Sequence, residues 1–459
     1  MSPRLVVIGL DCVTPELLFG PWLGVLPNIR KLMADGVHGR MQSTIPPITV
    51  PAWMAMMTSH DPGTLGVYGF RNRKSHQYDD NFTVNASHVT SKTVWNILSV
   101  NRKRSLVMGV PLTYPPKPLN GAMVGCFLTP DKSATFTYPA ELQARLDTLA
   151  GGEYLIDVKD FRNERRRETL EQIQVMTERR FRAFRALLRE DDWDFAMMVE
   201  MGPDRIHHAF WRFIDPEHRL YERGNEFEDV VRQYYIAMDA EIGRTVDTLP
   251  EDTSVIVVSD HGAKRMVGAI AINDFLAREG YLTFKSAPTS PTRLTADMVD
   301  WNRTLAWGDG GYYARIFLNV RGREPNGQIA PEDVARVRNE LKEKLEALGD
   351  MDGNPIGTRV YFPEDVYREC RGIPPDMIVY LGDLDWRSAG TVGNASVHLF
   401  DNDTGPDDAN HAPEGIFIWH NRGKAPARST ERVSIYDIAP SILDFYSIPT
   451  PSDMIGRPI

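Results

Sequence analysis

The stretch TSVIVVSDHGA (residues 253–263) is the most informative segment of the chain. Its first part is a continuous run of apolar, mostly β-branched residues, which is typical of a strand buried on both faces of a parallel sheet. Asp260 and His261 follow directly, at the carboxyl end of the strand, where open α/β sheets bind ligands. Neighbouring oxygen and nitrogen donors suit Zn²⁺ or Mn²⁺, and Gly262 lets the backbone turn away. A chance Asp-His pair in a loop is the alternative interpretation.

Other apolar runs of the same kind alternate with longer stretches of helical periodicity. Further strands are expected at 4–10, 105–110, 194–200, 314–320, 376–381 and 415–419. Helices are expected at 27–35, 51–59, 91–100, 138–148, 165–190, 204–213, 226–248, 331–348 and 435–446. This alternation predicts an α/β fold with a mostly parallel central sheet flanked by helices on both faces.

The length of 459 residues allows two ordinary domains or one large α/β domain with insertions. A helical insertion is expected around 130–190, with a long charged helix, and it is long enough to form a lid. A loop insertion is expected around 280–312, where the chain is rich in Pro, Ser and Thr.

The composition excludes several classes of protein. The formal net charge is −10, which argues against a nucleic-acid partner or an anionic membrane surface. Cys12, Cys126 and Cys370 are odd in number and widely spaced, so we expect free thiols in a reducing compartment. The first residues are too few for a signal peptide, and the sequence has no apolar run of about 18 residues. We therefore expect a cytoplasmic protein.

The segment MGPDRIHHAFW (201–211) supplies a second pair of donors. Asp204 and His208 are four residues apart on a predicted helix that begins just after a strand. This spacing places both side chains on one face, where they can bind one ion. His207 in place of His208 is an alternative, and a helix-start Asp beside a structural histidine is another.

Two further residues are candidates because of their positions beside strands. Asp11 ends the first apolar strand in GLDC, either as a ligand or as the cap of the following helix. His411 lies in the polar stretch DDANHAPEGIFIW (407–419), just before an apolar strand. Taken alone, His411 would be interpreted as a surface histidine.

Together these residues provide three carboxylates and three imidazoles, which are enough donors for two divalent ions. Two ions about 3.5–4 Å apart can hold a phosphoryl group between the attacking and leaving oxygens. Such a site needs a nucleophile, and Thr49 in STIPPITVPAWMAMMT (43–58) is the candidate. A metal or a base would activate its hydroxyl, and a helix start favours an attached phosphate. The alternative interpretation is a helix cap ahead of Pro51.

The motifs occur jointly and in order almost from end to end of the chain. They are VVIGLDC, LPNIRKLMADGVHG, STIPPITVPAWMAMMT, PGTLGVYGF, VPLTYPPKPLNGAMVGCFLTP, DRIHHAFW, VVSDHGA, IFLNVRGREPNGQI, NHAPEGIFI and YDIAPSILDFYSIPTPSDMIGRPI. In them the chain resembles the alkaline phosphatase superfamily, in its branch of type I phosphodiesterases/nucleotide pyrophosphatases. It is most similar to the phosphohydrolases or phosphomutases predicted in that superfamily. The resemblance implies a single alkaline-phosphatase-like catalytic domain over residues 1–459.

The resemblance also implies roles for individual residues. The family's ligands for one metal match Asp11, Thr49, Asp260 and His261. Its ligands for the other metal match Asp204, His208 and His411. The threonine of the family is also its covalent nucleophile. No Cys-x-Pro-x-Arg sequence surrounds any cysteine, so the formylglycine chemistry of the sulfatases is not expected.

The chain departs from the family where nucleotide pyrophosphatases carry a phosphate-binding Asn after the nucleophile. The residues that we expect to bind substrate instead are Phe70 at the matching position, Arg71, Arg73, Lys264 and Arg265. Arginine binds a doubly charged phosphate well, which tilts the prediction toward a monoester or a highly anionic substrate. Surface ion pairs are the alternative for these cations.

We therefore expect a two-metal-dependent hydrolase of phosphate monoesters or diesters that acts through a phosphothreonine intermediate. The expected cofactors are two Zn²⁺ ions, with Mn²⁺ as the alternative. The expected partner is a small anionic phosphate ester, with homo-oligomerisation left open. A phosphomutase or phosphotransferase with the same intermediate, or a phosphonate hydrolase, is the alternative. A binding protein that has lost activity is the least favoured.

Overall fold

The structure is a computed structural model that describes residues 4–421 and 428–459. The chain forms two compact units. The first unit comprises 1–65, 84–263 and 411–459, and the second unit comprises 66–83 and 264–410. The expectation of a single catalytic domain stays a prediction. Among the described residues, no helix has the length and apolar character needed to cross a bilayer.

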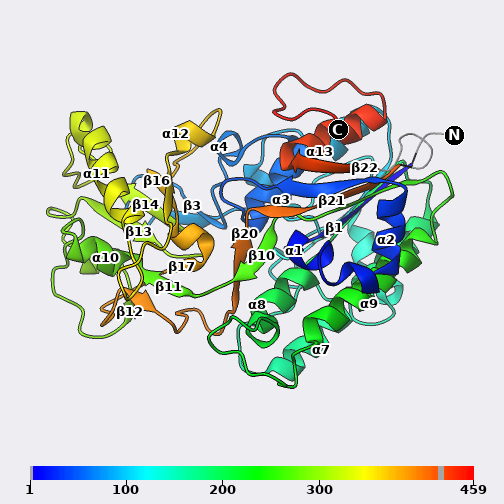
Figure 1. Ribbon diagram of the computed structural model, residues 1–459. Helices are drawn as coiled ribbons and strands as arrows, with labels where there is room; N and C mark the ends of the chain where they lie inside the picture. The colour runs from blue at the N-terminus through cyan, green and yellow to red at the C-terminus, as the bar shows by residue number, and fades with distance from the viewer. Residues whose placement is uncertain (1–3, 422–427) are drawn as a thin grey trace. The chain divides into compact units, whose positions relative to one another are not determined.

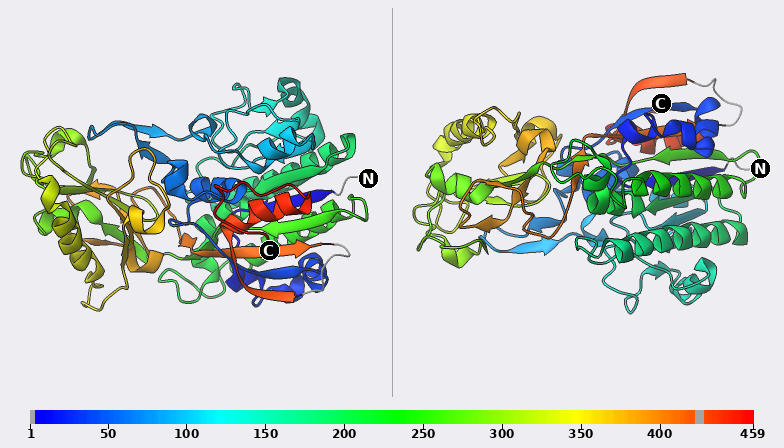
Figure 2. Two further views of the ribbon diagram at one scale, coloured as in Figure 1. Left: turned by 90° about the horizontal axis from the view of Figure 1, so that it is seen from above. Right: turned by 60° about the horizontal axis from the view of Figure 1, so that its bottom comes forward.

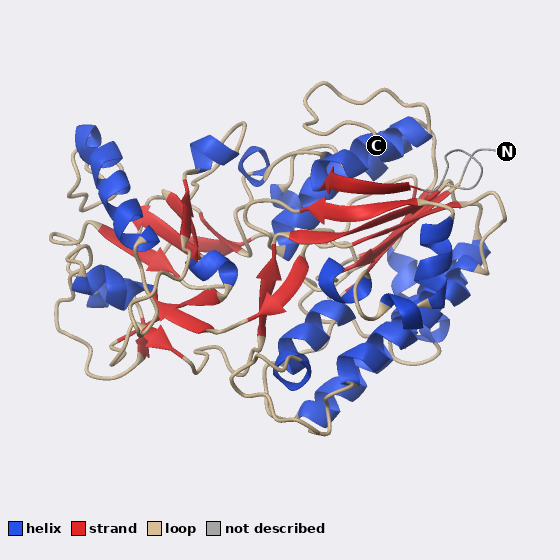
Figure 3. Ribbon diagram, viewed as in Figure 1, coloured by secondary structure: helices blue, strands red, loops and turns tan. Residues whose placement is uncertain are grey.

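The first unit is built on a nine-stranded sheet in the order β22-β2-β21-β9-β1-β8-β5-β6-β7 (Figure 3). Its strands are β1 (Leu5–Leu10), β2 (Val37–Gln42), β5 (Ser105–Met108), β6 (Gly121–Val124), β7 (Thr137–Tyr138), β8 (Phe195–Glu200), β9 (Ser254–Val258), β21 (Glu414–His420) and β22 (Arg428–Ser434). The strands β9, β1, β8, β5 and β6 are parallel, and β21 pairs antiparallel with both β9 and β2. The predicted α/β class with a mostly parallel sheet is confirmed.

Helices cover both faces of this sheet (Figures 1 and 2). They are α1 (Pro15–Leu18), α2 (Pro27–Ala34), α3 (Thr49–Thr58), α4 (Pro62–Leu65), α5 (Val94–Val100), α6 (Leu146–Ala150), α7 (Arg166–Glu190), α8 (Gly202–Ile214), α9 (Val230–Val246) and α13 (Ile438–Phe445). Figure 1 shows α3 and α13 on one face and α2, α7, α8 and α9 on the other. In α7 the apolar side chains of Ile173, Met176 and Phe184 are fully buried in the core. The role of the 130–190 region as a lid stays a prediction.

The three central strands β9, β1 and β8 are buried along their whole length, which explains their continuous apolar sequences. Gly9 in β1 has a specific packing role. A Cβ at this position would lie 2.4 Å from the Trp53 ring, so the glycine makes room for the indole of α3. This contact packs α3 directly against β1, next to the candidate site.

The second unit contains a four-stranded antiparallel sheet in the order β13-β14-β16-β15. Its strands and helices are β3 (Arg71–Arg73), β4 (Asn81–Thr83), β11 (Gly268–Ala271), β12 (Thr292–Arg293), β13 (Ala306–Asp309), β14 (Ala314–Leu318), β15 (Arg359–Tyr361), β16 (Met377–Tyr380), β17 (Trp386–Ala389), β18 (Thr391–Val392), β19 (His398–Leu399), α10 (Ile272–Arg278), α11 (Val334–Glu346) and α12 (Pro363–Val366). Placing the apolar runs 314–320 and 376–381 in the central parallel sheet is wrong. Both runs form strands. An apolar run indicates that a strand is buried on both faces, but it does not identify the strand with which it pairs.

Candidate active site

Most of the predicted ligands lie at one edge of the central sheet, for a reason of topology. Because β9, β1 and β8 are adjacent and parallel, their carboxyl ends meet at this edge. Asp11 follows β1, and the pair Asp260-His261 follows β9. Helix α8, which carries Asp204 and His208, begins just after β8. This is the edge at which open α/β sheets bind their ligands.

His411 and Thr49 reach the same edge from the other side of β9. Strand β21 is antiparallel to β9, so its amino-terminal end, preceded by His411, lies at this edge. Strand β2 is antiparallel to β21 in turn, and its last residue, Gln42, pairs with Glu414 at the start of β21. The chain then passes directly from β2 into α3, which begins at Thr49.

The Thr49 hydroxyl is buried and faces two of the predicted ligands. Its Oγ1 lies 3.2 Å from Nε2 of His261 and 3.4 Å from Oδ1 of Asp11, and the side chain is 3% exposed. Thr49 is the first residue of α3, and Ile48 stands at the N-cap position without a side-chain cap bond. The hydroxyl therefore points at the site and does not cap the helix.

One group of candidate ligands surrounds this hydroxyl. Asp11, Asp260 and His261 each place one ligand atom within 4.8 Å of the others. Nε2 of His261 is 3.1 Å from Oδ2 of Asp260 and 3.9 Å from Oδ1 of Asp11. All three side chains are fully buried. With Thr49, this group offers three oxygens and one nitrogen.

A second group consists of Asp204, His208 and His411 together with Cys12. Oδ1 of Asp204 is 3.2 Å from Nε2 of His208 and 3.7 Å from Nε2 of His411, and the two imidazole nitrogens are 3.3 Å apart. Ligand atoms held at about 2.0–2.1 Å around a tetrahedral ion lie about 3.3–3.4 Å from one another. The three distances therefore match the edges of a tetrahedral coordination shell.

Hydrogen bonds to neighbouring residues orient side chains in both groups. The indole Nε1–H of Trp53 donates to Oδ2 of Asp11 at 2.6 Å. Nδ1 of His411 lies 2.8 Å from the Pro47 carbonyl oxygen, and Nδ1 of His261 lies 3.1 Å from the Gly262 carbonyl oxygen. A carbonyl accepts from Nδ1–H, which leaves Nε2 of each ring free as a donor to a metal.

Two of the site histidines, His261 and His411, are neutral at neutral pH. Burial lowers the pKa of His261 to about 4. Burial, together with the neighbouring imidazoles of His261 and His208, holds the pKa of His411 well below its usual range. A neutral imidazole keeps the lone pair that a metal requires.

The pKa values of Asp11 and Asp204 are shifted in opposite directions. Burial and the negative charge of Asp204 raise the pKa of Asp11 well above its usual range. Burial would likewise raise the pKa of Asp204, but the nearby His208 and Arg205 outweigh it and hold this pKa well below its usual range. Packing several carboxylates into a buried space is unfavourable unless positive charge compensates them.

The site passes a simple test for fit to divalent cations. Oδ2 of Asp260 is buried and has no hydrogen-bond partner among the described residues. An orphaned carboxylate oxygen of this kind is costly unless a cation binds it. Neutral imidazoles facing buried carboxylate oxygens are the donors that Zn²⁺ and Mn²⁺ prefer. The residues present therefore fit two bound ions.

His207, the alternative to His208, lies outside both groups. Its Nε2 is hydrogen-bonded to the Tyr235 hydroxyl at 3.0 Å, and burial lowers the pKa of the ring to about 3. It is thus a neutral core histidine between α8 and α9.

Arg205 is a residue of the site that the sequence analysis did not single out. Its guanidinium contacts Asp204 and also binds Asp157 through two hydrogen bonds, of 3.0 and 2.7 Å. It lies 4.7 Å from the ring centroid of Phe161. Its place directly after Asp204 was the only signal in the sequence, because Asp157 lies 48 residues away.

The residues that we expected to bind substrate all belong to the second unit. Arg73 is 6% exposed and ion-paired with Glu324 at 3.2 Å, and Lys264 is ion-paired with Asp385 at 2.6 Å. Phe70 is 37% exposed, and Arg265 is half-buried on β10 (Gly262–Arg265). Arg71 differs from the others because it lines a cavity.

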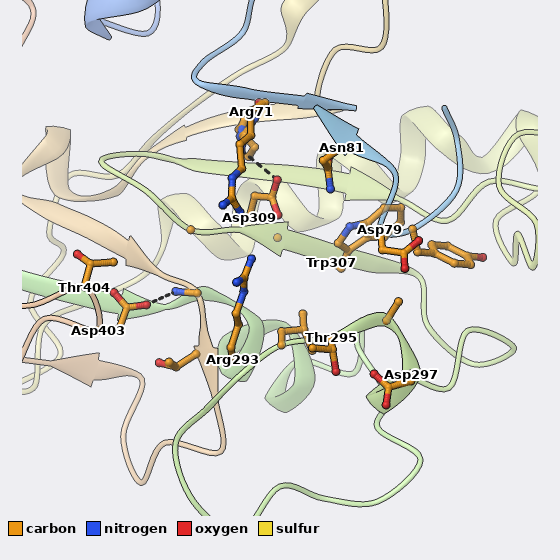
Figure 4. Close-up of a pocket in the computed structure, with 18 of the residues that line it drawn as sticks. Arg71, Asp79, Asn81, Arg293, Thr295, Asp297, Trp307, Asp309, Asp403 and Thr404 are labelled. Atoms are coloured by element: carbon orange, nitrogen blue, oxygen red, sulfur yellow. Dashed lines mark hydrogen bonds and ion pairs between the residues drawn. The ribbon is translucent and has the colours of Figure 1, made fainter. Parts of the chain in front are cut away.

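This cavity lies within the second unit and has a volume of about 860 Å³ (Figure 4). Arg71 and Arg293 extend into it from opposite walls, and Tyr78, Trp301 and Trp307 line it as well. Within the described part of the chain, neither arginine side chain makes an ion pair or a hydrogen bond. The volume is in the range of small-molecule sites.

Comparisons with known proteins agree with this geometry. The model of the family "Type I phosphodiesterase / nucleotide pyrophosphatase" matches residues 5–407, which confirms the resemblance inferred from the motifs. A comparison with curated protein sequences gave no significant match.

Solved structures of similar fold include human ectonucleotide pyrophosphatase/phosphodiesterase 5, with a TM-score of 0.56, 14% identity and coverage of 99% of this chain and 97% of that one. An inactive variant of the murine protein, solved with AMP, has a TM-score of 0.56, 12% identity and coverage of 99% and 97%. Phosphonoacetate hydrolase from Sinorhizobium meliloti 1021, solved with phosphonoformate, has a TM-score of 0.62, 15% identity and coverage of 97% and 95%. These likenesses establish the shared fold.

Proposed function

Because the chain belongs to the type I phosphodiesterase/nucleotide pyrophosphatase family, and is thus a hydrolytic enzyme of the alkaline phosphatase superfamily, we propose that it hydrolyses small phosphate esters with Thr49 as nucleophile. The observation that carries this proposal is the position of the Thr49 hydroxyl. It is buried 3.2 Å from His261 and 3.4 Å from Asp11, at an edge where six acidic and imidazole side chains converge.

Two divalent cations, Zn²⁺ in preference to Mn²⁺, would supply the positive charge that stabilises the phosphoryl oxygens in the transition state. Asp11, Asp260, His261 and Thr49 would hold one ion. Asp204, His208 and His411 would hold the other. The burial of every one of these residues excludes bulk water and strengthens the electrostatic interactions inside the site.

The chain's own residues would act in the following order. The Thr49 oxygen attacks phosphorus and the bond to the leaving oxygen breaks. A phosphothreonine forms, and the leaving alcohol carries away the proton that the hydroxyl gave up. Water then cleaves this ester, which releases phosphate or a phosphomonoester and restores the hydroxyl. Thr49 begins α3, and the first turn of a helix has backbone N–H groups without intrahelical partners that favour a phosphate there.

The substrate is an anionic small molecule in this proposal, and the substrate-binding role of Arg71 stays a prediction. Guanidinium groups suit an anion, and those of Arg71 and Arg293 extend into the cavity, which the carboxylates of Asp79, Asp297, Asp309 and Asp403 line as well. Arg73 and Lys264, by contrast, already have carboxylate partners.

The experiment combines metal analysis with an assay of three aryl esters: bis(p-nitrophenyl) phosphate, p-nitrophenyl phosphate and p-nitrophenyl phenylphosphonate. We expect bound divalent metal and hydrolysis of at least one ester, lost on chelation and restored by Zn²⁺ or Mn²⁺. No hydrolysis of any ester with either metal would contradict the proposal. Reaction in ¹⁸O-labelled water distinguishes hydrolysis, which puts label into the product, from transfer to another hydroxyl, which does not.

A further inference from the structure

Cys12 lies within the second group of candidate ligands. Its Sγ is within 4.8 Å of a ligand atom of each of Asp204, His208 and His411, and its side chain is fully buried. The thiol donates a weak hydrogen bond to the Gly262 carbonyl oxygen at 3.4 Å. A buried thiol beside two imidazoles and a carboxylate is a typical set of ligands for Zn²⁺.

The backbone at Cys12 is unusual for a residue with a side chain. Its φ is +67°, in the left-handed region that glycine adopts at no steric cost. The turn is held by the Cys12 N–H, which donates to Oδ1 of Asp260 at 3.2 Å. Backbone strain of this kind often occurs at functional sites.

We propose that the Cys12 thiolate is a fourth protein ligand of the ion held by Asp204, His208 and His411. This inference rests on the proposed two-metal function. Binding would release the thiol proton to solvent and form a bond between sulfur and the metal. Three of the corners already have the separations of a tetrahedral shell, from 3.2 to 3.7 Å, and sulfur would occupy the fourth.

The two groups would then differ in chemical character. The group around Thr49 offers three oxygens and one nitrogen, which suits hard ions such as Mn²⁺ as well as Zn²⁺. The group with Cys12 would add a soft sulfur to two nitrogens and one oxygen, which favours Zn²⁺ and Co²⁺ over Mn²⁺. Four protein ligands also close a zinc shell, so this ion would open a position for substrate only by adding a fifth ligand or by releasing sulfur.

Cobalt reports this bond directly, because a thiolate bound to Co²⁺ gives a charge-transfer absorption in the near ultraviolet that oxygen and nitrogen ligands do not give. The metal-free full-length protein is titrated with Co²⁺ and its spectrum recorded. We expect the band to grow to saturation with one of the bound ions. In Cys12→Ser the band should be lost while Co²⁺ still binds, and it should persist in Cys126→Ser and Cys370→Ser.

Cys12→Gly guards against misfolding of the serine variant, since glycine suits the positive φ. A band that persists in either Cys12 variant, or Co²⁺ binding to the natural protein without a band, overturns the inference. In both of those cases metal-dependent ester hydrolysis can remain, so the proposed function stands. If the natural protein binds no Co²⁺, Zn²⁺ or Mn²⁺ at all, the proposed function fails, and the ligand role of Cys12 fails with it.

Discussion

The Thr49 hydroxyl and Nε2 of His261 lie 3.2 Å apart although 212 residues separate them in the chain. One is the first residue of a helix and the other follows the end of a strand. Both atoms are buried, and both face Asp11, whose Oδ1 is 3.4 Å from the hydroxyl and 3.9 Å from the imidazole nitrogen. A hydroxyl in this position lies beside an imidazole nitrogen and a carboxylate oxygen, and both of these atoms can donate to a cation.

Replacing Thr49 should therefore remove turnover without unfolding the protein. We expect Thr49→Ala to lower kcat by about 10³-fold or more, because it removes the hydroxyl that would accept the phosphoryl group. Thr49→Ser, the matched control, keeps a hydroxyl and should keep a measurable part of the activity. Steady-state kinetics with an aryl phosphate ester, alongside circular dichroism, measures both. A Thr49→Ala enzyme with near-normal kcat would exclude the nucleophile role.

The indole of Trp53 should matter for metal binding through Asp11. Trp53→Phe removes the N–H that donates to Oδ2 at 2.6 Å but keeps most of the ring beside Gly9. Loss of such a supporting bond typically weakens metal binding about 10–100-fold. Trp95→Phe, at another buried tryptophan on α5, is the control and should leave affinity unchanged. Calorimetric titration with Zn²⁺ compares the two, and equal affinities would contradict the role of Trp53.

Arg205 should set the pH range of metal binding. It helps to hold the pKa of Asp204 below its usual range, so Arg205→Met should raise that pKa and let protons compete with the metal at higher pH. Zn²⁺ affinity should then fall more at about pH 5 than at about pH 8. Arg212→Met, on the same helix and ion-paired with Glu164 at 3.1 Å, is the control. A loss of equal size at both pH values would point to a purely structural role for Arg205.

The cavity of the second unit can be tested through its two arginines. The double variant Arg71→Met and Arg293→Met should raise KM for a highly anionic ester and leave kcat nearly unchanged, since the charges bind substrate equally in the ground and transition states. Arg303→Met, at an exposed position of the same unit, is the control. Unchanged KM for every substrate in the double variant would remove Arg71 from the substrate-binding residues.

Buried tyrosines should make the protein sensitive to alkaline pH. Burial raises the pKa of Tyr313 to about 12 from an ordinary value of 10.0. Between these values the folded chain binds more protons than the unfolded chain, so stability falls as pH rises, by up to about 1.4 kcal/mol per pH unit for one group. Tyr313→Phe should flatten this slope above pH 10.0 and leave the slope near neutral pH unchanged. Urea denaturation across this range measures both, and identical slopes would refute the assignment.

The sequence predicted which residues converge in the candidate site better than it predicted their environment. Asp11, Asp260 and His261 were predictable because each follows an apolar strand, and parallel strands end at a common edge. His411 was ambiguous in isolation, because its position depends on β21 pairing antiparallel to β9. Strand pairing of this kind is a long-range property that a single segment does not encode.

Contacts behind the ligands were not predictable for the same reason. The bond from Trp53 to Asp11 requires Gly9 to leave space for the indole, and the anchoring of Arg205 requires Asp157 to fold back onto α8. Neither pair has a recognisable spacing. The misplacement of 314–320 and 376–381 has a related cause, since their partners in the antiparallel sheet are set by pairing and not by apolar content.

The interleaving of the two units along the chain has a consequence during synthesis. Residues 411–459 complete the first unit, and β21 inserts between β9 and β2 in the middle of its sheet. Until the ribosome has made this segment, the strand that lies between β2 and β9 is missing. The second group of candidate ligands also lacks His411. A nascent chain thus carries Thr49 and most of the candidate ligands before the site is complete. In the proposed two-metal enzyme, the second ion would therefore find all of its protein ligands only in chains translated past His411.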